Sequence, residues 1–219
     1  MKNEDIYLTM SDIARPLLEN FSYPYEVLPH IKEYILELGN TLSDEYILRG
    51  ENVWIHKSAR VDETAHIDGP AIIGEESEIR HCAFVRGSVI IGKRCVLGNS
   101  CEIKNSILMD DVQVPHFNYV GDSIFGNHAH TGAGVIVSNL KSDKTNVTIK
   151  YGEERVETGL RKVGAFLGDN VEVGCNSVLN PGTIIGPNSR VYPLTSVRGY
   201  VPPDSIAKKT NEIVTRKDV

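Results

Sequence analysis

An aliphatic residue recurs every six positions along most of this chain, and this spacing constrains the fold more than any other feature. A small or short side chain usually follows it four positions later. A period of six fits neither the 3.6 residues of an α-helical turn nor the alternation of an isolated strand, so each unit must be a short strand plus a corner. The aliphatic positions are Ile55, Val61, Ile67, Ile73, Ile79, Val85, Ile91, Leu97 and Ile103, and later Leu167, Val173, Leu179, Ile185, Val191 and Val197.

Three such units would close a triangular coil of eighteen residues, with coils stacked at a strand spacing of ~4.8 Å. Aliphatic side chains would point inward, and glycines directly after them, such as Gly74 and Gly92, would relieve the corners. The pattern resembles the hexapeptide-repeat left-handed parallel β-helix. The left hand is implied by this resemblance, because ordinary parallel crossovers are right-handed. We therefore expect a mainly β protein of this fold.

The composition agrees with a core of Ile, Val and Leu, since aromatic residues make up only 7% of the chain. The net charge of -6 argues against a general partner of nucleic acid or acidic membranes. No N-terminal apolar run has signal or transmembrane length, so we expect a cytoplasmic protein without a membrane partner. Cys95 and Cys101 occupy the small-residue position and are predicted to be buried, and no C-x-x-C spacing supports zinc.

Residues 1–54 lack the six-residue repeat and are predicted to be a helical cap. Apolar residues lie at helical spacing from Tyr23 to Leu38, Gly39 is a plausible stop, and a shorter helix is expected around Ser11 to Asn20. Stacked repeats need covered ends, so we expect this segment to pack on the first coil and cover its open end.

The β-helix is predicted to span residues 55–203, with an insertion at 138–162 and a tail at 204–219. The insertion contains an alternating segment, Val147, Ile149 and Tyr151, followed by Gly152, which predicts a projecting β-hairpin. Long insertions in rigid solenoids are usually functional or serve assembly. The polar tail is expected to be a short helix or a loose end.

Between Met109 and Phe125 the repeat loses register. Leu108 comes one residue early, Val114 and Val120 follow the shifted count, and Phe125 is early again. Something other than core packing must shape this region.

Arg86 and Lys104 each follow an aliphatic position and are eighteen residues apart, so they should stack in adjacent coils. Two cations at that distance repel each other unless an anion lies between them, and a phosphate is the anion we favour. The alternative is an internal pair, because Asp68 occupies the same place one coil earlier.

His116 lies where the repeat loses register, and could be a catalytic base or simply a structural, exposed histidine. His128 and His130 are two apart and would share one face of an extended segment. With His116 they form a weak signal for a zinc cluster.

The segment from Glu102 to Lys144 carries the most specific motifs. They are Glu-Ile-Lys-Asn-Ser (102–106), Pro-His-Phe-Asn-Tyr-Val-Gly-Asp-Ser (115–123), Gly-Ala-Gly (132–134), Asn139 and Lys144. This closely resembles the acetyltransferase domain of the bifunctional N-acetylglucosamine-1-phosphate uridyltransferases. The segments 157–165 and 167–171 and the inserted hairpin look like the archaeal sugar-1-phosphate nucleotidyltransferase/acetyltransferase variant. The resemblance covers roughly residues 50–210.

Position by position, the resemblance implies the following roles. His116 would be the general base, helped at the catalytic centre by Tyr119 and Asn139. The substrate-binding residues would be Arg86, Lys104, Tyr119, His130 and Lys144, and the coenzyme contacts would be Ala133, Gly168 and Lys208, with the Ala133 N–H near the thioester oxygen. Two departures stand out: His130 replaces a common asparagine, and Leu194 replaces a glycine of the uridyltransferases.

Together these features predict an acetyl-CoA-dependent N-acetyltransferase acting on an amino-sugar 1-phosphate, with no metal required. The resemblance implies a homotrimer, whose neighbouring coils would build each site together. Nothing in residues 1–54 resembles a nucleotide loop, so we expect no nucleotidyltransferase activity. Two alternatives stay open, namely a non-catalytic sugar-phosphate or nucleotide-sugar binding module and a zinc enzyme of the carbonic-anhydrase type. The motifs do not identify the amino sugar.

Overall fold

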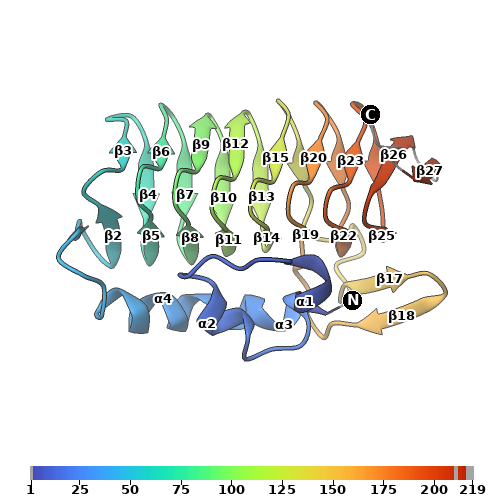
Figure 1. The fold of residues 1–219 in the computed structure, drawn as a ribbon, viewed down its shortest axis with the longest axis horizontal. Helices are drawn as coiled ribbons and strands as arrows, with labels where there is room; N and C mark the ends of the chain where they lie inside the picture. Colours follow the sequence, from blue (N-terminus) through green and yellow to red (C-terminus); the bar gives the residue numbers. More distant parts are fainter. Residues whose placement is uncertain (1, 210–211, 216–219) are drawn as a thin grey trace.

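The computed structural model describes residues 2–209 and 212–215, and it shows a parallel β-solenoid whose three sheets form the sides of a prism (Figure 1). The predicted left-handed β-helix is confirmed. The first sheet, sheet A, contains β2 (Val53–His56), β5 (Ala71–Ile73), β8 (Val89–Ile91), β11 (Ser106–Leu108), β14 (Ile124–Phe125), β19 (Ala165–Leu167), β22 (Thr183–Ile185) and β25 (Tyr200–Val201), with β1 (Tyr46–Leu48) antiparallel at its edge.

The other two sheets follow the same order along the solenoid. Sheet B contains β3 (Arg60–Val61), β6 (Glu78–Ile79), β9 (Val96–Asn99), β12 (Gln113–His116), β15 (His130–Thr131), β20 (Glu172–Val173), β23 (Arg190–Val191), β26 (Ser205–Lys209) and β27 (Glu212–Thr215). Sheet C contains β4 (His66–Asp68), β7 (Phe84–Arg86), β10 (Glu102–Lys104), β13 (Tyr119–Gly121), β16 (Ile136–Val137), β21 (Val178–Leu179) and β24 (Ser196–Val197).

The six-residue repeat builds the interior as predicted, because its aliphatic side chains form one continuous buried core along the axis. The register loss also has a structural basis. Leu108 pairs with Ile91, and Phe125 with Leu108, so each of these coils is one residue shorter than eighteen. Both residues are lost at the corner between sheets C and A, where Asn105 and Asp122 adopt positive φ angles of 44° and 51°.

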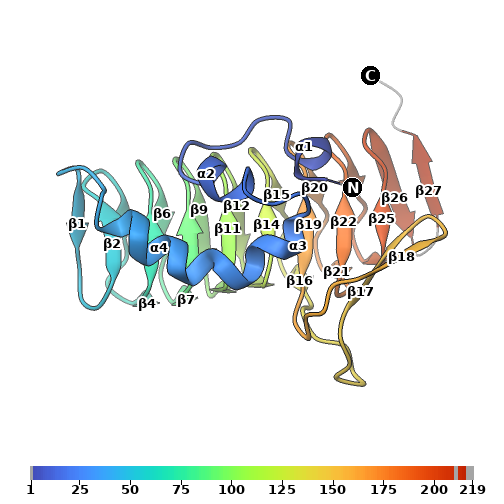
Figure 2. The same ribbon diagram turned by 90° about the horizontal axis from the view of Figure 1, so that it is seen from below.

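The N-terminal helices cover a side of the solenoid rather than its end (Figures 1 and 2). They are α1 (Asn3–Ile6), α2 (Arg15–Leu18), α3 (Pro24–Val27), the 3₁₀ turn η1 (Leu28–His30) and α4 (Ile31–Gly39). They pack on the outward side chains of sheet A, which are unusually apolar. These are Trp54, Ile72, Ile90, Ile107, Ile124, Phe166 and Ile184. The predicted helices and the stop at Gly39 are confirmed, with the earlier helix shortened to Arg15–Leu18 and Pro16 in its first turn.

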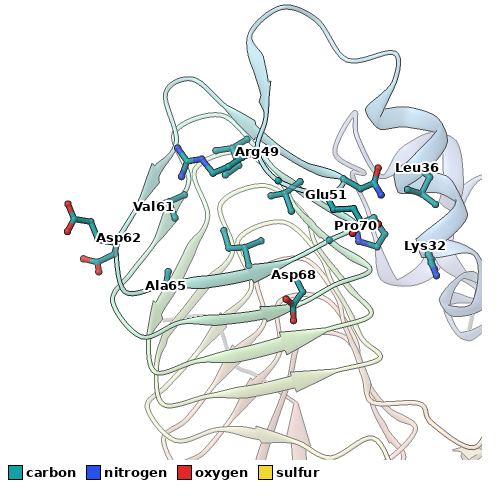
Figure 3. Close-up of a pocket in the computed structure, with 16 residues that line it drawn as sticks. Lys32, Leu36, Arg49, Glu51, Val61, Asp62, Ala65, Asp68 and Pro70 are labelled. Atoms are coloured by element: carbon teal, nitrogen blue, oxygen red, sulfur yellow. The ribbon is translucent and has the colours of Figure 1, made fainter.

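The segment does pack on the first coil, where Gly39 of α4 lies against Trp54 of β2. The expectation that it also covers the open end was wrong, because sheet A offers a longer apolar surface than the end does. The end stays open, as Figure 3 shows, and forms a cavity of about 950 Å³ with an aliphatic floor and a charged rim. Val61 and Ala65 belong to its floor, and Arg49, Asp62 and Asp68 to its rim. No predicted site residue lines this cavity.

The insertion contains the predicted hairpin, formed by β17 (Thr148–Tyr151) and β18 (Glu154–Glu157). Val147 and Ile149 are buried against the same apolar cluster as the N-terminal helices. The expectation for the tail was wrong in the described residues. Instead of a helix or loose end, β26 continues sheet B beside β23, and β27 returns antiparallel to it.

Candidate functional site

Arg86 and Lys104 stack in successive coils of sheet C, as their spacing predicts. The register pairs Phe84 with Glu102 and Val85 with Ile103. Arg86 and Lys104 are the next residues of the two strands, so they lie side by side on the outer face of sheet C. Asp68 stands opposite Arg86 in the preceding coil, but its carboxylate bonds the His66 ring at 2.9 Å. The predicted stack therefore exists, and the alternative pair with Asp68 does not form.

Each of the two cations has a different carboxylate partner. The Arg86 guanidinium donates to Glu102 at 2.6 Å, and this hydrogen bond raises the pKa of the Arg86 side chain. Lys104 Nζ lies 3.4 Å from Asp122 Oδ2, in a largely buried pair. Mutual repulsion of the cations thus does not by itself require an external anion, because the chain supplies two carboxylates.

Asp122 is the centre of a buried polar cluster at the shortened corner, with 5% of its surface exposed. Its carboxylate accepts a hydrogen bond from Asn105 at 2.9 Å, pairs with Lys104, and accepts a short one from the Asn139 amide. The Asn139 amide also donates to the Tyr119 hydroxyl at 3.2 Å. Loss of one residue per coil at this corner therefore brings Lys104, Tyr119 and Asn139 together.

Tyr119 lies half-buried on β13 at the edge of this cluster. Burial raises the pKa of its phenol, and the hydrogen bond from Asn139 lowers it by less, so the hydroxyl is protonated at neutral pH. The hydroxyl accepts from Asn139 and keeps its own proton to donate to a ligand.

His116 ends β12 at a second corner, between sheets B and C, and is exposed. Its Nδ1 lies 3.1 Å from Asn99 Oδ1. An amide oxygen only accepts, so this contact assigns the Nδ1 proton to the bond and leaves the Nε2 lone pair free. The backbone N–H of His116 donates to Asn118 Oδ1 at 3.1 Å, and this hydrogen bond holds the backbone that carries the imidazole.

Ala133 belongs to the same corner as His116, one coil further along the axis. The Gly134 N–H donates to the His116 carbonyl at 3.0 Å. The Ala133 N–H forms no hydrogen bond with any residue in the described part of the chain, and the residue is half-buried. A free backbone donor therefore lies one coil away from His116 at the same corner.

The remaining predicted residues lie elsewhere in a single chain. His130 faces outward on sheet B and bonds Glu172 at 2.8 Å. Lys144 is exposed in the insertion loop, and Lys208 is exposed on β26. Gly168 is buried at the corner between sheets A and B, where an added Cβ would lie 2.8 Å from the Ile6 carbonyl oxygen. Their predicted roles stay predictions.

The three histidines of the zinc alternative do not converge within one chain. His128 lies 3.9 Å from Asp111, while His116 and His130 face Asn99 and Glu172. Within residues 2–209 and 212–215, no three His, Cys, Asp or Glu side chains gather as a metal site.

Sequence reasoning gave no role to three residues that hold this arrangement: Glu102, Asp122 and Asn99. Asp122 and Glu102 lie inside the quoted motifs. Asp122 also stands at the corner where the repeat loses its second residue. Asn99 could have been found by the coil count, because the register pairs it with His116.

Comparison with known proteins assigns the chain to a family. Residues 69–193, more than half of the chain, match the model of the GMPPB C-terminal domain. The chain belongs to the GMPPB C-terminal domain family. The predicted relation to hexapeptide-repeat acyltransferases of the archaeal bifunctional type is also confirmed, because curated relatives of that kind cover most of the chain.

Two of these relatives define the extent of the match. A "Bifunctional protein GlmU" of Methanococcus aeolicus is 34% identical over 94% of this chain and 58% of its own length. A "Bifunctional sugar-1-phosphate nucleotidylyltransferase/acetyltransferase" of Sulfurisphaera tokodaii is 36% identical over 64% of this chain and 40% of its own. This member of the GMPPB C-terminal domain family thus spans about half the length of the curated relatives it matches.

A solved structure of a putative acetyltransferase from Bacillus cereus covers 76% of this chain and 79% of its own, with 21% identity and a TM-score of 0.43. Among the described residues, no helix is both long enough and apolar enough to cross a membrane.

Proposed function

We propose that this chain is an acetyl-CoA-dependent N-acetyltransferase that acts on an amino-sugar 1-phosphate, with His116 as the general base. The observation that carries the proposal is the exposed imidazole whose Nδ1 is engaged by Asn99 Oδ1. That bond leaves Nε2 as a proton acceptor facing solvent at the corner between sheets B and C. Membership in the GMPPB C-terminal domain family, with acetyltransferases among the relatives, supports the reaction class.

In the proposed reaction the substrate amine attacks the thioester carbonyl carbon of acetyl-CoA. The C–N bond forms, and His116 Nε2 takes the proton that the amine loses. The carbonyl oxygen becomes an oxyanion, which the free Ala133 N–H in the neighbouring coil would stabilise. The C–S bond then breaks, and the proton held by His116 neutralises the leaving thiolate.

The substrate would lie on the outer face of sheet C. Tyr119 can donate its hydroxyl proton to a sugar oxygen, since the hydroxyl already accepts from Asn139. Arg86 is 44% exposed and pairs with a carboxylate that is also accessible, so a phosphate can replace or share Glu102. Lys104 is paired with Asp122 and is less exposed than Arg86, so it would contact only a phosphate that lies close to the sheet.

Four predicted residues, His130, Lys144, Gly168 and Lys208, lie away from this face within one copy. A homotrimer would place a neighbour's sheet or insertion beside sheet C, and we propose that the complete site needs that assembly. Sedimentation of the purified chain tests this, with a monomer at assay concentration and full activity as the contradicting result.

The test of function is thiol release from acetyl-CoA with a panel of hexosamine 1-phosphates, with the N-acetyl product identified by mass. We expect turnover with at least one sugar, and a KM for it that rises ~10-fold or more in Arg86→Gln. Arg94→Gln, an exposed arginine paired with Asp111 at the next corner, is the matched control and should leave KM unchanged. Absence of turnover with every sugar contradicts the proposal.

A further inference from the structure

The inserted hairpin and the corner between sheets C and A enclose a cavity of about 490 Å³ that no role above uses. Thr148, Lys150 and Arg155 line it from the hairpin. Asn180 and Arg198 line it from the last coils, with the backbone of Gly182 and Gly199 at its base. Hairpin and coils are in contact here, because a Cβ added to Gly199 would lie 3.2 Å from the Lys150 carbonyl oxygen.

Lys150 and Arg155 face each other directly across the two strands of the hairpin. Opposed side chains in an antiparallel pair have Cβ atoms only ~4.5–5.5 Å apart, and like charges in that position destabilise the pair. Neither side chain forms an ion pair or a hydrogen bond with any other described residue. The hairpin therefore carries a repulsive charge pair that its own residues do not compensate.

The surroundings add positive charge and few negative groups. Arg198 comes from the coil and has only a 3.5 Å contact with the Asn180 amide oxygen. Lys141 also lines the cavity, but it is paired with Asp143, the sole carboxylate in the lining. Glu157 shares the outward face of the hairpin, and its carboxylate accepts the Thr148 hydroxyl at 2.9 Å.

We propose that this cavity binds a ligand that carries a diphosphate group. Three cations from two separate elements, Lys150, Arg155 and Arg198, line it, and each phosphate of such a ligand can accept hydrogen bonds from arginine and lysine donors. The Thr148 hydroxyl and the Asn180 amide also line the wall, but they already donate to Glu157 and to Ser196 and Val197. The site is distinct from the Arg86 and Lys104 stack, which lies in earlier coils of sheet C.

The diphosphate could belong to coenzyme A, to a nucleotide-linked sugar or to a separate nucleotide, and all share the same recognition. The probe is inorganic pyrophosphate, titrated calorimetrically into the full chain at low and at raised salt. We expect saturable binding that weakens with salt, and a loss of ~10-fold or more in Arg155→Gln and in Lys150→Gln.

Two controls separate binding from folding. Without ligand, Arg155→Gln and Lys150→Gln should melt at the wild-type temperature or above it, since each removes the repulsion. Arg198→Gln must weaken binding as well, although it lies outside the hairpin. Arg161→Gln, an exposed arginine of the same insertion outside this cavity, should bind within ~2-fold of wild type.

Competition then identifies the source of the diphosphate. Displacement by coenzyme A assigns it to the acetyl donor, displacement by a nucleotide-linked hexosamine assigns it to the acceptor, and either result supports the site. No saturable binding by wild type, or equal losses in Arg161→Gln and Arg155→Gln, overturns it. Because binding is measured without acetyl transfer, this result stands apart from the proposed reaction.

Discussion

Sheet A and sheet C share one aliphatic interior but differ completely on their outer faces. The outward side chains of sheet A are large and apolar, and the N-terminal helices and the inserted hairpin bury them. Those of sheet C include Arg86, Glu102, Lys104 and Tyr119, and no helix among residues 2–209 and 212–215 packs on them (Figure 1). The repeat therefore defines the scaffold, while the outward positions decide whether a face is packed or available for chemistry.

The largest expected effect is on catalysis at the uncovered face, that of sheet C. His116→Ala should lower kcat by ~10²- to 10⁴-fold, because it removes the proposed proton acceptor. Steady-state thiol release measures this, and the melting temperature should be unchanged because the side chain is exposed. Asn99→Ala is the companion variant: it leaves the imidazole but removes the partner of Nδ1, and should lower kcat by less than His116→Ala does. Wild-type kcat in His116→Ala would refute the assignment.

The next largest effect is on stability, at the outer face of sheet A that the helices cover. Phe166→Ala removes a fully buried outward side chain of sheet A and should cost ~3–5 kcal/mol of unfolding free energy. Ile136→Ala, an outward residue of sheet C that is 40% exposed, should cost no more than ~0.5–1 kcal/mol. Denaturant unfolding compares them. Equal costs would mean that the two faces do not differ in packing.

Asp122→Ala tests the buried polar cluster at the boundary between the two faces. It leaves the Lys104 ammonium, 19% exposed, without its carboxylate and should cost about 1–3 kcal/mol. The same variant should raise KM for the sugar phosphate by displacing Lys104 and Asn139. Unaltered stability and KM would show that the cluster is incidental.

The smallest effect concerns the attachment of the N-terminal segment to the solenoid. Asp169 accepts hydrogen bonds from the backbone N–H groups of Thr9 and Asn127, and burial raises the pKa of its carboxyl. The folded state then binds this proton more readily than the unfolded state, so the contribution of Asp169 to stability grows as pH falls toward the raised pKa. Unfolding of wild type and Asp169→Asn at pH 7 and pH 5 measures the difference. We expect the stability of wild type, relative to the variant, to be greater at pH 5.

The sequence predicted the interior well because burial of Ile55, Val85 and their equivalents leaves a strict period. It also predicted the stack of Arg86 on Lys104, which needs only the coil length. It could not predict that Asp122 would compensate Lys104, because the corner that brings them together is shorter than the repeat. The N-terminal segment was wrongly predicted to cover the open end. The apolar outward positions of sheet A, such as Ile72 and Ile90, were not distinguished from the inward ones.

One comparison of substrates tests the central claim most directly. Thiol release from acetyl-CoA should be measured with the fastest hexosamine 1-phosphate, with the same amino sugar lacking phosphate, and with the analogue that has a hydroxyl in place of the amine. The account predicts rapid release with the first, a raised KM with the second and background release with the third. Equal rates with the amine and the hydroxyl analogue, or background release with all three, would contradict it.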